Sequence, residues 1–310
     1  MVGRVFVTGG TGFVGSSVIE TLLARGYEIA ALVHRRGVGR DDVRVHQVKG
    51  ELFDVQALTR GMEGCRAVIH LVGIIREKPK LGATFERMHV EATQCILNAA
   101  GNAGVKRLVH MSALGTRANA ISQYHRTKWA AEELVRASGL DWTIIRPSLI
   151  HGPGGEFMQM EARWARGTAP PYLFMPYFGK GLFGTGGSGR LQPVYVGDVA
   201  RAFADAIERP QTVGKVYELG GAQVVTWPEL HRICAEVIVG RRRWVAAIPT
   251  WKARLWLAVV PNSLLPFNQD QVVMSQEDNT CDLAAFVRDF GWEPAGFEES
   301  LQAYAMKNAL

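Results

Sequence analysis

Two side chains near the middle of the chain have the types and the spacing of an acid/base pair. Tyr124 and Lys128 stand four residues apart in a segment whose apolar residues recur at helical spacing, so both belong to one face of a helix. An ammonium beside a phenol favours the phenolate, and we expect it to lower the pKa of Tyr124 toward the working pH. The pair is a candidate for proton transfer, although this spacing also occurs by chance in many helices.

A glycine-rich stretch at the start of the chain indicates what would bring a reactant to this pair. Val5–Val7 reads as a buried strand, and apolar residues recur at helical spacing over 14–23. Gly9 allows a tight reversal, Gly12 a close approach of the backbone to a pyrophosphate, and Gly15 close packing of the helix on the strand. We predict that the turn binds a nucleotide through the amides of the helix N-terminus. The residues of this predicted site are Gly9, Thr11, Gly12, Phe13, Val14 and Gly15.

The end of the second predicted strand bears on the choice of nucleotide. After Ile29–Val33 the chain continues with His34, Arg35 and Arg36, where enzymes that select NAD place an acidic residue against the ribose 2′-hydroxyl. A guanidinium pairs instead with a 2′-phosphate, so the sequence favours NADP(H), with Arg35 as the better candidate. The alternative is a surface arginine pair beside a site that also accepts NAD.

Strand and helix patterns alternate through the first half of the chain. The further strands are predicted at 43–48, 67–71 and 107–111. With a long helix over 85–103, these connections imply an α/β fold, a doubly wound parallel sheet of the Rossmann type with the ligand at the carboxyl ends of the strands. We expect a nucleotide-binding domain over 1–150, to which a strand and helix near 190–210 return, and a smaller α+β lobe over 151–310.

Composition and charge narrow the class of protein. The chain has 35 basic and 29 acidic side chains, a net charge of +6 without a long run of one sign, which argues against a nucleic-acid-binding tail. Four cysteines lie far apart, which suits free thiols in a reducing compartment. His70 has no second histidine at metal-ligand spacing, and no apolar stretch reaches the roughly 20 residues that span a bilayer. We therefore expect a cytoplasmic protein, at most peripheral to the inner face of a membrane, with no metal.

Several motifs together resemble the extended and atypical short-chain dehydrogenase/reductases, which include NAD-dependent epimerase/dehydratase-like proteins. They are a Thr8-Gly-x-x-Gly-x-x-Gly turn, the Tyr-x-x-x-Lys pair, an Arg146-Pro-x-x-x-x-Gly segment and a Pro193-Val-x-Val-x-Asp-Val-Ala segment. In the last of these we expect Asp198 to cap a helix. Residues 248–279 resemble the C-terminal half of one atypical group, that of the nucleotide-binding accessory subunit of respiratory complex I. The resemblance thus covers essentially the whole chain.

The resemblance implies roles for individual residues. Tyr124 would pass a proton to or from the substrate oxygen, and Lys128 would also hold the nicotinamide ribose. Active members carry a hydroxyl residue after the fifth strand, where this chain has Ser112 followed by Ala113. Either Ser112 reaches the substrate, or the third catalytic group is missing. The other implied cofactor contacts are Glu51 and Leu52 at the adenine, Val72 and Gly73 beneath the cofactor, and Pro147, Ser148 and Leu149 beside the nicotinamide.

Three functions remain open at this point. The first is an NADP(H)-dependent oxidoreductase acting on the carbonyl or alcohol of a small-molecule substrate. The second is a non-catalytic NADPH-binding accessory or assembly module of a respiratory or membrane complex. It would dock through 251–267, where Trp251 and Trp256 with flanking cations suit a membrane surface or a partner, unless this is an ordinary packed helix. The third, a nucleotide-sugar epimerase or dehydratase, ranks lower because Ala113 replaces the expected hydroxyl.

Overall fold

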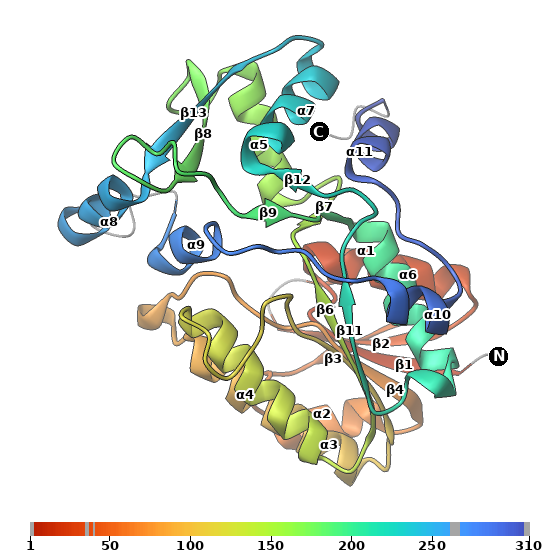
Figure 1. The fold of residues 1–310 in the computed structure, drawn as a ribbon. Coiled ribbons are helices and arrows are strands. Elements are labelled where there is room, and N and C mark those ends of the chain that lie inside the picture. The colour runs from red at the N-terminus through yellow and green to blue at the C-terminus, as the bar shows by residue number, and fades with distance from the viewer. Residues whose placement is uncertain (1–2, 35–36, 40, 261–266, 307–310) are drawn as a thin grey trace. The chain divides into compact units, whose positions relative to one another are not determined.

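The structure of the protein is a computed structural model that describes residues 3–34, 37–39, 41–260 and 267–306 (Figure 1). The chain forms two compact units. The first comprises Met1–Pro147, Val196–Leu219 and Asp282–Trp292, and the second comprises Ser148–Tyr195, Gly220–Cys281 and Glu293–Leu310. Two later segments of the chain therefore join the N-terminal segment in the first unit.

A seven-stranded parallel sheet forms the centre of the first unit. Its strands are β1 (Arg4–Thr8), β2 (Glu28–Val33), β3 (Val45–Lys49), β4 (Cys65–His70), β5 (Arg107–Met111), β6 (Asp141–Pro147) and β11 (Lys215–Leu219). Their spatial order is β11, β6, β5, β4, β1, β2, β3. The chain runs outward from β1 through β2 and β3 and then crosses to β4 on the other side of β1. This confirms the predicted doubly wound arrangement, whose switch point lies between the carboxyl ends of β1 and β4.

Helices flank the sheet of the first unit (Figure 1). α1 (Phe13–Ala24) packs with α6 (Val196–Glu208), while α2 (Val55–Met62) packs with α3 (Ala92–Asn102) and α3 with α4 (Gln123–Ala137). The core between α2, α3 and the strands includes Phe6, Leu58, Met62, Val68 and Ile96. Apolar side chains of the helices thus cover the strands whose carboxyl ends carry the predicted site.

Two expectations about helices need correction. The helix predicted over 85–103 exists in its second half as α3, but it is preceded by a π-helical segment, Glu86–Glu91. Such segments are rare and often mark functional positions. Asp198 lies within the first turn of α6, which begins at Val196, so the expectation that it caps this helix is wrong. Its charge still favours the helix N-terminus electrostatically.

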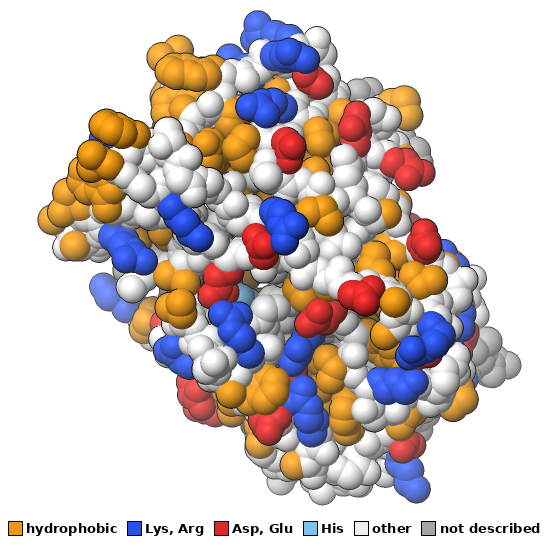
Figure 2. All heavy atoms as spheres, in the orientation of Figure 1, with side chains coloured by type: hydrophobic (Ala, Val, Ile, Leu, Met, Phe, Trp, Pro, Cys, Tyr) orange, Lys and Arg blue, Asp and Glu red, His pale blue; other side chains and the backbone are white. Residues whose placement is uncertain are grey.

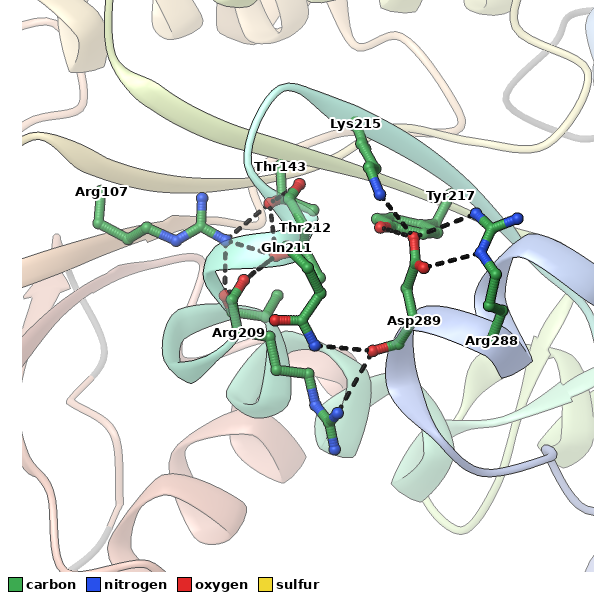
Figure 3. A network of polar contacts seen from close by, with 10 residues as sticks. Arg107, Thr143, Arg209, Gln211, Thr212, Lys215, Tyr217, Arg288 and Asp289 are labelled. Carbon is green, nitrogen blue, oxygen red and sulfur yellow. Dashed lines mark hydrogen bonds and ion pairs between the residues drawn. The ribbon is translucent and has the colours of Figure 1, made fainter.

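A polar network fastens the two later segments to the sheet (Figure 3). Asp289, on α10 (Ala284–Phe290), accepts hydrogen bonds from Tyr217 Oη at 2.7 Å and Lys215 Nζ at 2.9 Å, both on β11. Hydrogen bonds from Arg288, Lys215 and Tyr217 hold the pKa of the Asp289 carboxyl well below its usual range. On β5, Arg107 donates to two threonine hydroxyls, and burial lowers its pKa to about 10. Charged hydrogen bonds to Asp289 therefore hold β11 in place, in addition to its backbone hydrogen bonds with β6.

The second unit pairs short strands and packs them against helices. The pairs are β7 (Ile150–His151) with β10 (Val194–Tyr195), β8 (Phe174–Gly179) with β13 (Trp244–Pro249), and β9 (Arg190–Leu191) with β12 (Val225–Thr226). The helices are α5 (Glu156–Arg166), α7 (Trp227–Val239), α8 (Thr250–Val259), α9 (Gln269–Met274) and α11 (Phe297–Ala305). α7 begins with a capping box made by Thr226 and Glu229. Its buried face shares a core with α5 and α11 that includes Met158, Leu230 and Phe297.

Candidate functional site

The glycine turn between β1 and α1 is built as its spacing predicts. Gly9 has a φ of +75°, and the Gly12 amide donates to the Gly9 carbonyl at 3.0 Å. A Cβ at Gly15 would collide with the Gly9 carbonyl oxygen and the Gly10 backbone. The turn therefore needs glycine at position 9 for its backbone conformation and at position 15 for the close approach of α1.

The N-terminus of α1 is open to an anion. α1, which is described over its whole length, has no side-chain cap and no acidic residue in its first turn. Thr11 and Gly12 are exposed, while Phe13 and Val14 are partly buried in the first turn. The first amides of a helix lack partners inside it and carry the positive end of its dipole. These residues fit the phosphates of a dinucleotide, as the sequence predicts.

The end of β4 lies against this turn. A Cβ at Gly9 would come within 3.3 Å of the Leu71 carbonyl carbon and of the Val72 amide nitrogen. At the next residue, a Cβ at Gly73 would lie only 2.9 Å from Lys128 Nζ. The structure thus brings together the glycine turn, the small residues after β4 and the predicted lysine, although they are far apart in sequence.

Lys128 is buried on α4, near the end of β5. Its Nζ donates to the Met111 carbonyl at 3.0 Å, and burial lowers its pKa to about 8 against the opposing charge of Glu132. Tyr124 lies one turn earlier on α4, and its ring packs edge-on against those of Phe85 and His89. No hydrogen bond of the Tyr124 hydroxyl is found within the described part of the chain.

The pKa of Tyr124 differs from the sequence prediction. We expected Lys128 to lower it, but burial of the phenol raises the pKa to about 12. Burial is the cause of this shift, and Lys128, whose ammonium donates to a backbone carbonyl, does not offset it. Spacing along the helix placed the two residues on the same face, but it did not reveal that burial shifts the pKa of both.

The turn after β5 contains two buried hydroxyls. Ser112 is buried, and its Oγ donates to Thr116 Oγ1 at 3.4 Å. Thr116 is buried as well and follows Ala113 by three residues. Thr116 was not recognised from the sequence because it lies outside the expected dipeptide, and the catalytic role of Ser112 stays a prediction.

Neutral histidines lie beneath the predicted site. His89, in the π-helical segment, shares a hydrogen bond between Nδ1 and Thr127 Oγ1 at 2.8 Å, and its Nε2 lies 3.2 Å from both the amide nitrogen and the carbonyl oxygen of Ile74. Burial, followed by the charge of Lys128, lowers the pKa of His89 to about 2 and that of His70 to about 3. His89 therefore holds the residue next to Lys128 on α4 and the strand end beside Gly73. No short sequence pattern predicts this positioning role of His89.

The remaining predicted cofactor residues fall into three groups. His34 Nδ1 lies 3.9 Å from Glu51 Oε1 near the end of β2, whereas Arg35 and Arg36 lie outside the described residues. Leu52 packs on the core of the first unit, and the Pro147 carbonyl at the end of β6 accepts from the Leu114 amide. The second unit contains Ser148 and Leu149, whose Oγ and amide both donate to Asn279 Oδ1, at 2.5 Å and 3.2 Å.

Comparison with known proteins decides the family. A family model described as NAD(P)H-binding matches residues 9–162. A ceramide reductase of Caulobacter vibrioides is 30% identical over 248 residues, which cover 78% of this chain and 73% of that protein. The chain belongs to the NAD(P)-binding short-chain dehydrogenase/reductase family. The predicted family and its NAD(P)-type cofactor are thereby confirmed.

Two further similarities bear on the subgroup. The mitochondrial NADH dehydrogenase (ubiquinone) 1 alpha subcomplex subunit 9 of Arabidopsis thaliana is 32% identical over 250 residues, covering 77% of this chain and 58% of that protein. This short-chain dehydrogenase/reductase thus spans less than two thirds of that relative. A UDP-glucose 4-epimerase of Thermotoga maritima, solved with UDP-glucose, is 21% identical with a TM-score of 0.74, covering 98% of this chain and 97% of that one. At that identity the likeness shows the fold.

The part of the chain that the structure describes contains neither a metal-binding cluster nor a membrane-spanning helix. Within it there is no group of three or more histidine, cysteine, aspartate or glutamate side chains placed to hold a metal ion. Among the same residues, no helix is both long and apolar enough to cross a bilayer.

Proposed function

We propose that this short-chain dehydrogenase/reductase is an NADP(H)-dependent oxidoreductase that interconverts a carbonyl and an alcohol. The observation that supports it most is the position of Lys128, which is buried at the carboxyl edge of the sheet between the Met111 carbonyl and Gly73. Lysines are rarely buried because the ammonium loses hydration. A lysine kept there, one turn from Tyr124 and beside the glycine turn, serves proton transfer.

The proposed roles follow from the states of the two groups. The bound nicotinamide supplies or accepts the hydride at the reacting carbon. With its pKa raised to about 12, Tyr124 is a neutral phenol at neutral pH and suits donation of its proton to the oxygen of a carbonyl. Carbonyl reduction then forms one C–H bond from the hydride and one O–H bond from the phenol proton. In this proposal Lys128 stabilises the phenolate that remains, and the Ser112 and Thr116 hydroxyls are the candidates to bond the substrate oxygen.

Selection of NADP(H) is assigned to the arginines after β2. The end of β2 carries Val33, His34, Arg35 and Arg36 in sequence and no carboxylate. We expect Arg35→Ala to weaken NADPH binding much more than NADH binding, since only NADPH has the 2′-phosphate. Isothermal titration of both nucleotides measures this, with the exposed Arg60→Ala as the matched control. Equal losses for the two nucleotides would contradict the assignment.

The acid/base assignment is tested with Tyr124→Phe. The full chain is loaded with NADPH and offered a panel of carbonyl compounds, and NADPH oxidation is followed by its absorbance. We expect the variant to bind NADPH like the parent and to lose turnover. If NADPH oxidation survives the substitution, another group transfers the proton and the proposed mechanism is wrong.

A second candidate function is an NADPH-binding accessory module of a respiratory or membrane complex. It is favoured by the similarity to the complex I subunit of Arabidopsis and by Ala113, which stands where active relatives carry a hydroxyl. In that case NADPH raises the unfolding temperature of the chain, but no carbonyl compound oxidises it, and Tyr124→Phe changes neither result. The same two assays therefore separate the candidates.

A further inference from the structure

Helix α8 in the second unit is unusually exposed for its composition. Of its ten residues, Thr250–Val259, only Ala253 is buried. Its exposed side chains include two tryptophans, a leucine and a valine: Trp251, Trp256, Leu255 and Val259. A helix this short is not stable in water by its own propensity and normally buries an apolar face. Much of the apolar surface of α8 is therefore left for another surface to cover.

The loop after β8 extends this surface. Trp251 Nε1 donates to the Leu182 carbonyl at 3.0 Å, which fixes the glycine-rich segment 179–189 beside α8. Leu182 and Phe183 point outward from that loop and are exposed like the residues of α8. We define the apolar surface of the second unit by six side chains, 39–76% exposed: Leu182, Phe183, Trp251, Leu255, Trp256 and Val259. Hydrophobic side chains gather at the left of the molecule in Figure 2, where Figure 1 places α8 and this loop.

The two segments that form the apolar surface carry charges of one sign. Lys180 stands in the loop, and Lys252 and Arg254 stand on α8, all exposed. The segments 179–189 and 250–259 contain no acidic residue. Lys252 Nζ lies 5.5 Å from the centre of the Trp251 ring. Tryptophans beside cations are typical of helices that lie in a membrane interface, where indole rings reach the acyl boundary and cations meet lipid phosphates.

The C-terminal end of the predicted docking segment, 251–267, is packed and not exposed like α8. Phe267 packs edge-on against Phe178, with ring centres 4.9 Å apart, so it belongs to the packing of the second unit. Residues 261–266 lie outside the described residues. The sequence predicted docking through 251–267; the exposed part of that region is α8, and the loop after β8 extends the exposed surface.

We propose that this apolar surface docks on a lipid bilayer that carries anionic headgroups, with α8 lying in the plane of the interface. The charge complementarity decides the occupant: Lys252 and Arg254 are exposed on α8, which has no acidic residue, and they match a negative lipid surface, whereas Lys180 interacts with Asp278. The inference does not depend on catalysis. An NADPH oxidoreductase and an accessory module could both use this surface, and it places the protein peripherally on the membrane.

Flotation of the full chain with vesicles tests the proposal. We compare phosphatidylcholine vesicles with and without phosphatidylglycerol, and expect binding to the anionic vesicles that weakens as salt is added. Lys252→Gln with Arg254→Gln should weaken that binding about 30-fold, from about 1 kcal/mol per cation. The matched control, Lys78→Gln with Lys106→Gln, removes two exposed cations from the first unit and should have no effect.

The apolar part is tested with Phe183→Ser and Leu255→Ser together. We expect this variant to stay in solution with either vesicle, while Leu81→Ser, at an exposed position of the first unit, floats like the parent. Circular dichroism and urea midpoints show that each variant is folded. Three results overturn the proposal: no flotation of the parent chain, equal flotation of the parent and the surface variants, or sedimentation showing that the same surface joins two copies of this chain.

Discussion

A buried histidine with no partner makes the sharpest prediction for this protein. Both ring nitrogens of His110 on β5 are buried without a hydrogen-bond partner among the described residues. Its ring centre lies 5.4 Å from that of His70. Burial, then the charges of His70 and Lys128, hold the pKa of His110 well below the ordinary 6.5. We predict that His110→Leu makes the protein less sensitive to acid.

The size of the effect follows from proton linkage. Below pH 6.5 the unfolded chain binds a proton at residue 110 that the folded protein does not, so the free energy of unfolding falls as the pH falls. The loss approaches about 1.4 kcal/mol per pH unit for one such histidine. Between pH 7 and pH 5 it amounts to about 2 kcal/mol, provided that the folded protein keeps His110 neutral. His70 and His89, with pKa values of about 3 and about 2, add losses of the same sign.

Urea unfolding at pH 7, 6 and 5 measures this prediction. At pH 7 we expect His110→Leu to be at least as stable as the parent, because it removes two unpaired polar atoms from the core. At pH 5 the variant should have gained about 2 kcal/mol on the parent relative to pH 7. Hydrogen exchange of the β5 amides assigns the change to the first unit. His46→Leu, at an exposed position, controls for the loss of a histidine.

The result that would refute this reasoning is a parallel loss of stability in the parent and in His110→Leu between pH 7 and pH 5. It would mean that residue 110 is protonated in the folded protein as readily as in the unfolded chain. A larger loss in the variant would mean that folding raises the pKa of His110, so that its protonated ring stabilises the folded protein.

Two further predictions concern the first unit. Gly73→Ala places a methyl group 2.9 Å from Lys128 Nζ. Displacement of the ammonium should lower turnover about 100-fold, while the urea midpoint changes little. Unchanged turnover would show that the close approach of Gly73 to Lys128 has no function. Tyr217→Phe removes the 2.7 Å hydrogen bond to Asp289 and should lower the free energy of unfolding by about 1.5 kcal/mol. In urea unfolding, the exposed Tyr172→Phe is its control, and equal midpoints for the two variants would contradict the structural role of the network.

Sequence reasoning located most of the candidate site because its strongest signals are local. Gly9 and Gly15 follow from the backbone of one turn, and Tyr124 and Lys128 follow from the period of one helix. The same periodicity gave the order of strands and helices, and with it the side of the sheet where the ligand binds. Arg35, also identified by its place after β2, stays a prediction.

Other features depend on segments that meet only after folding. Thr116 joins Ser112, and His89 reaches Thr127, through contacts that no short pattern encodes. The attachment of Asp282–Trp292 to the first unit likewise rests on an ion pair with a strand about 70 residues earlier. In the second unit, the composition of α8 allowed either a packed helix or a docking surface; its exposure argues against the packed helix, and docking stays a proposal.

The amino-acid sequence by itself determined the fold and the NAD(P)-binding family, and it predicted the acid/base pair, since each rests on residue types at short, regular spacings. Only the tertiary structure decided the direction of the pKa of Tyr124, the neutrality of the buried histidines and the exposure of α8. The physical reason is that hydration decides all three. How much water surrounds a side chain depends on every segment packed around it, and those segments come from distant parts of the chain.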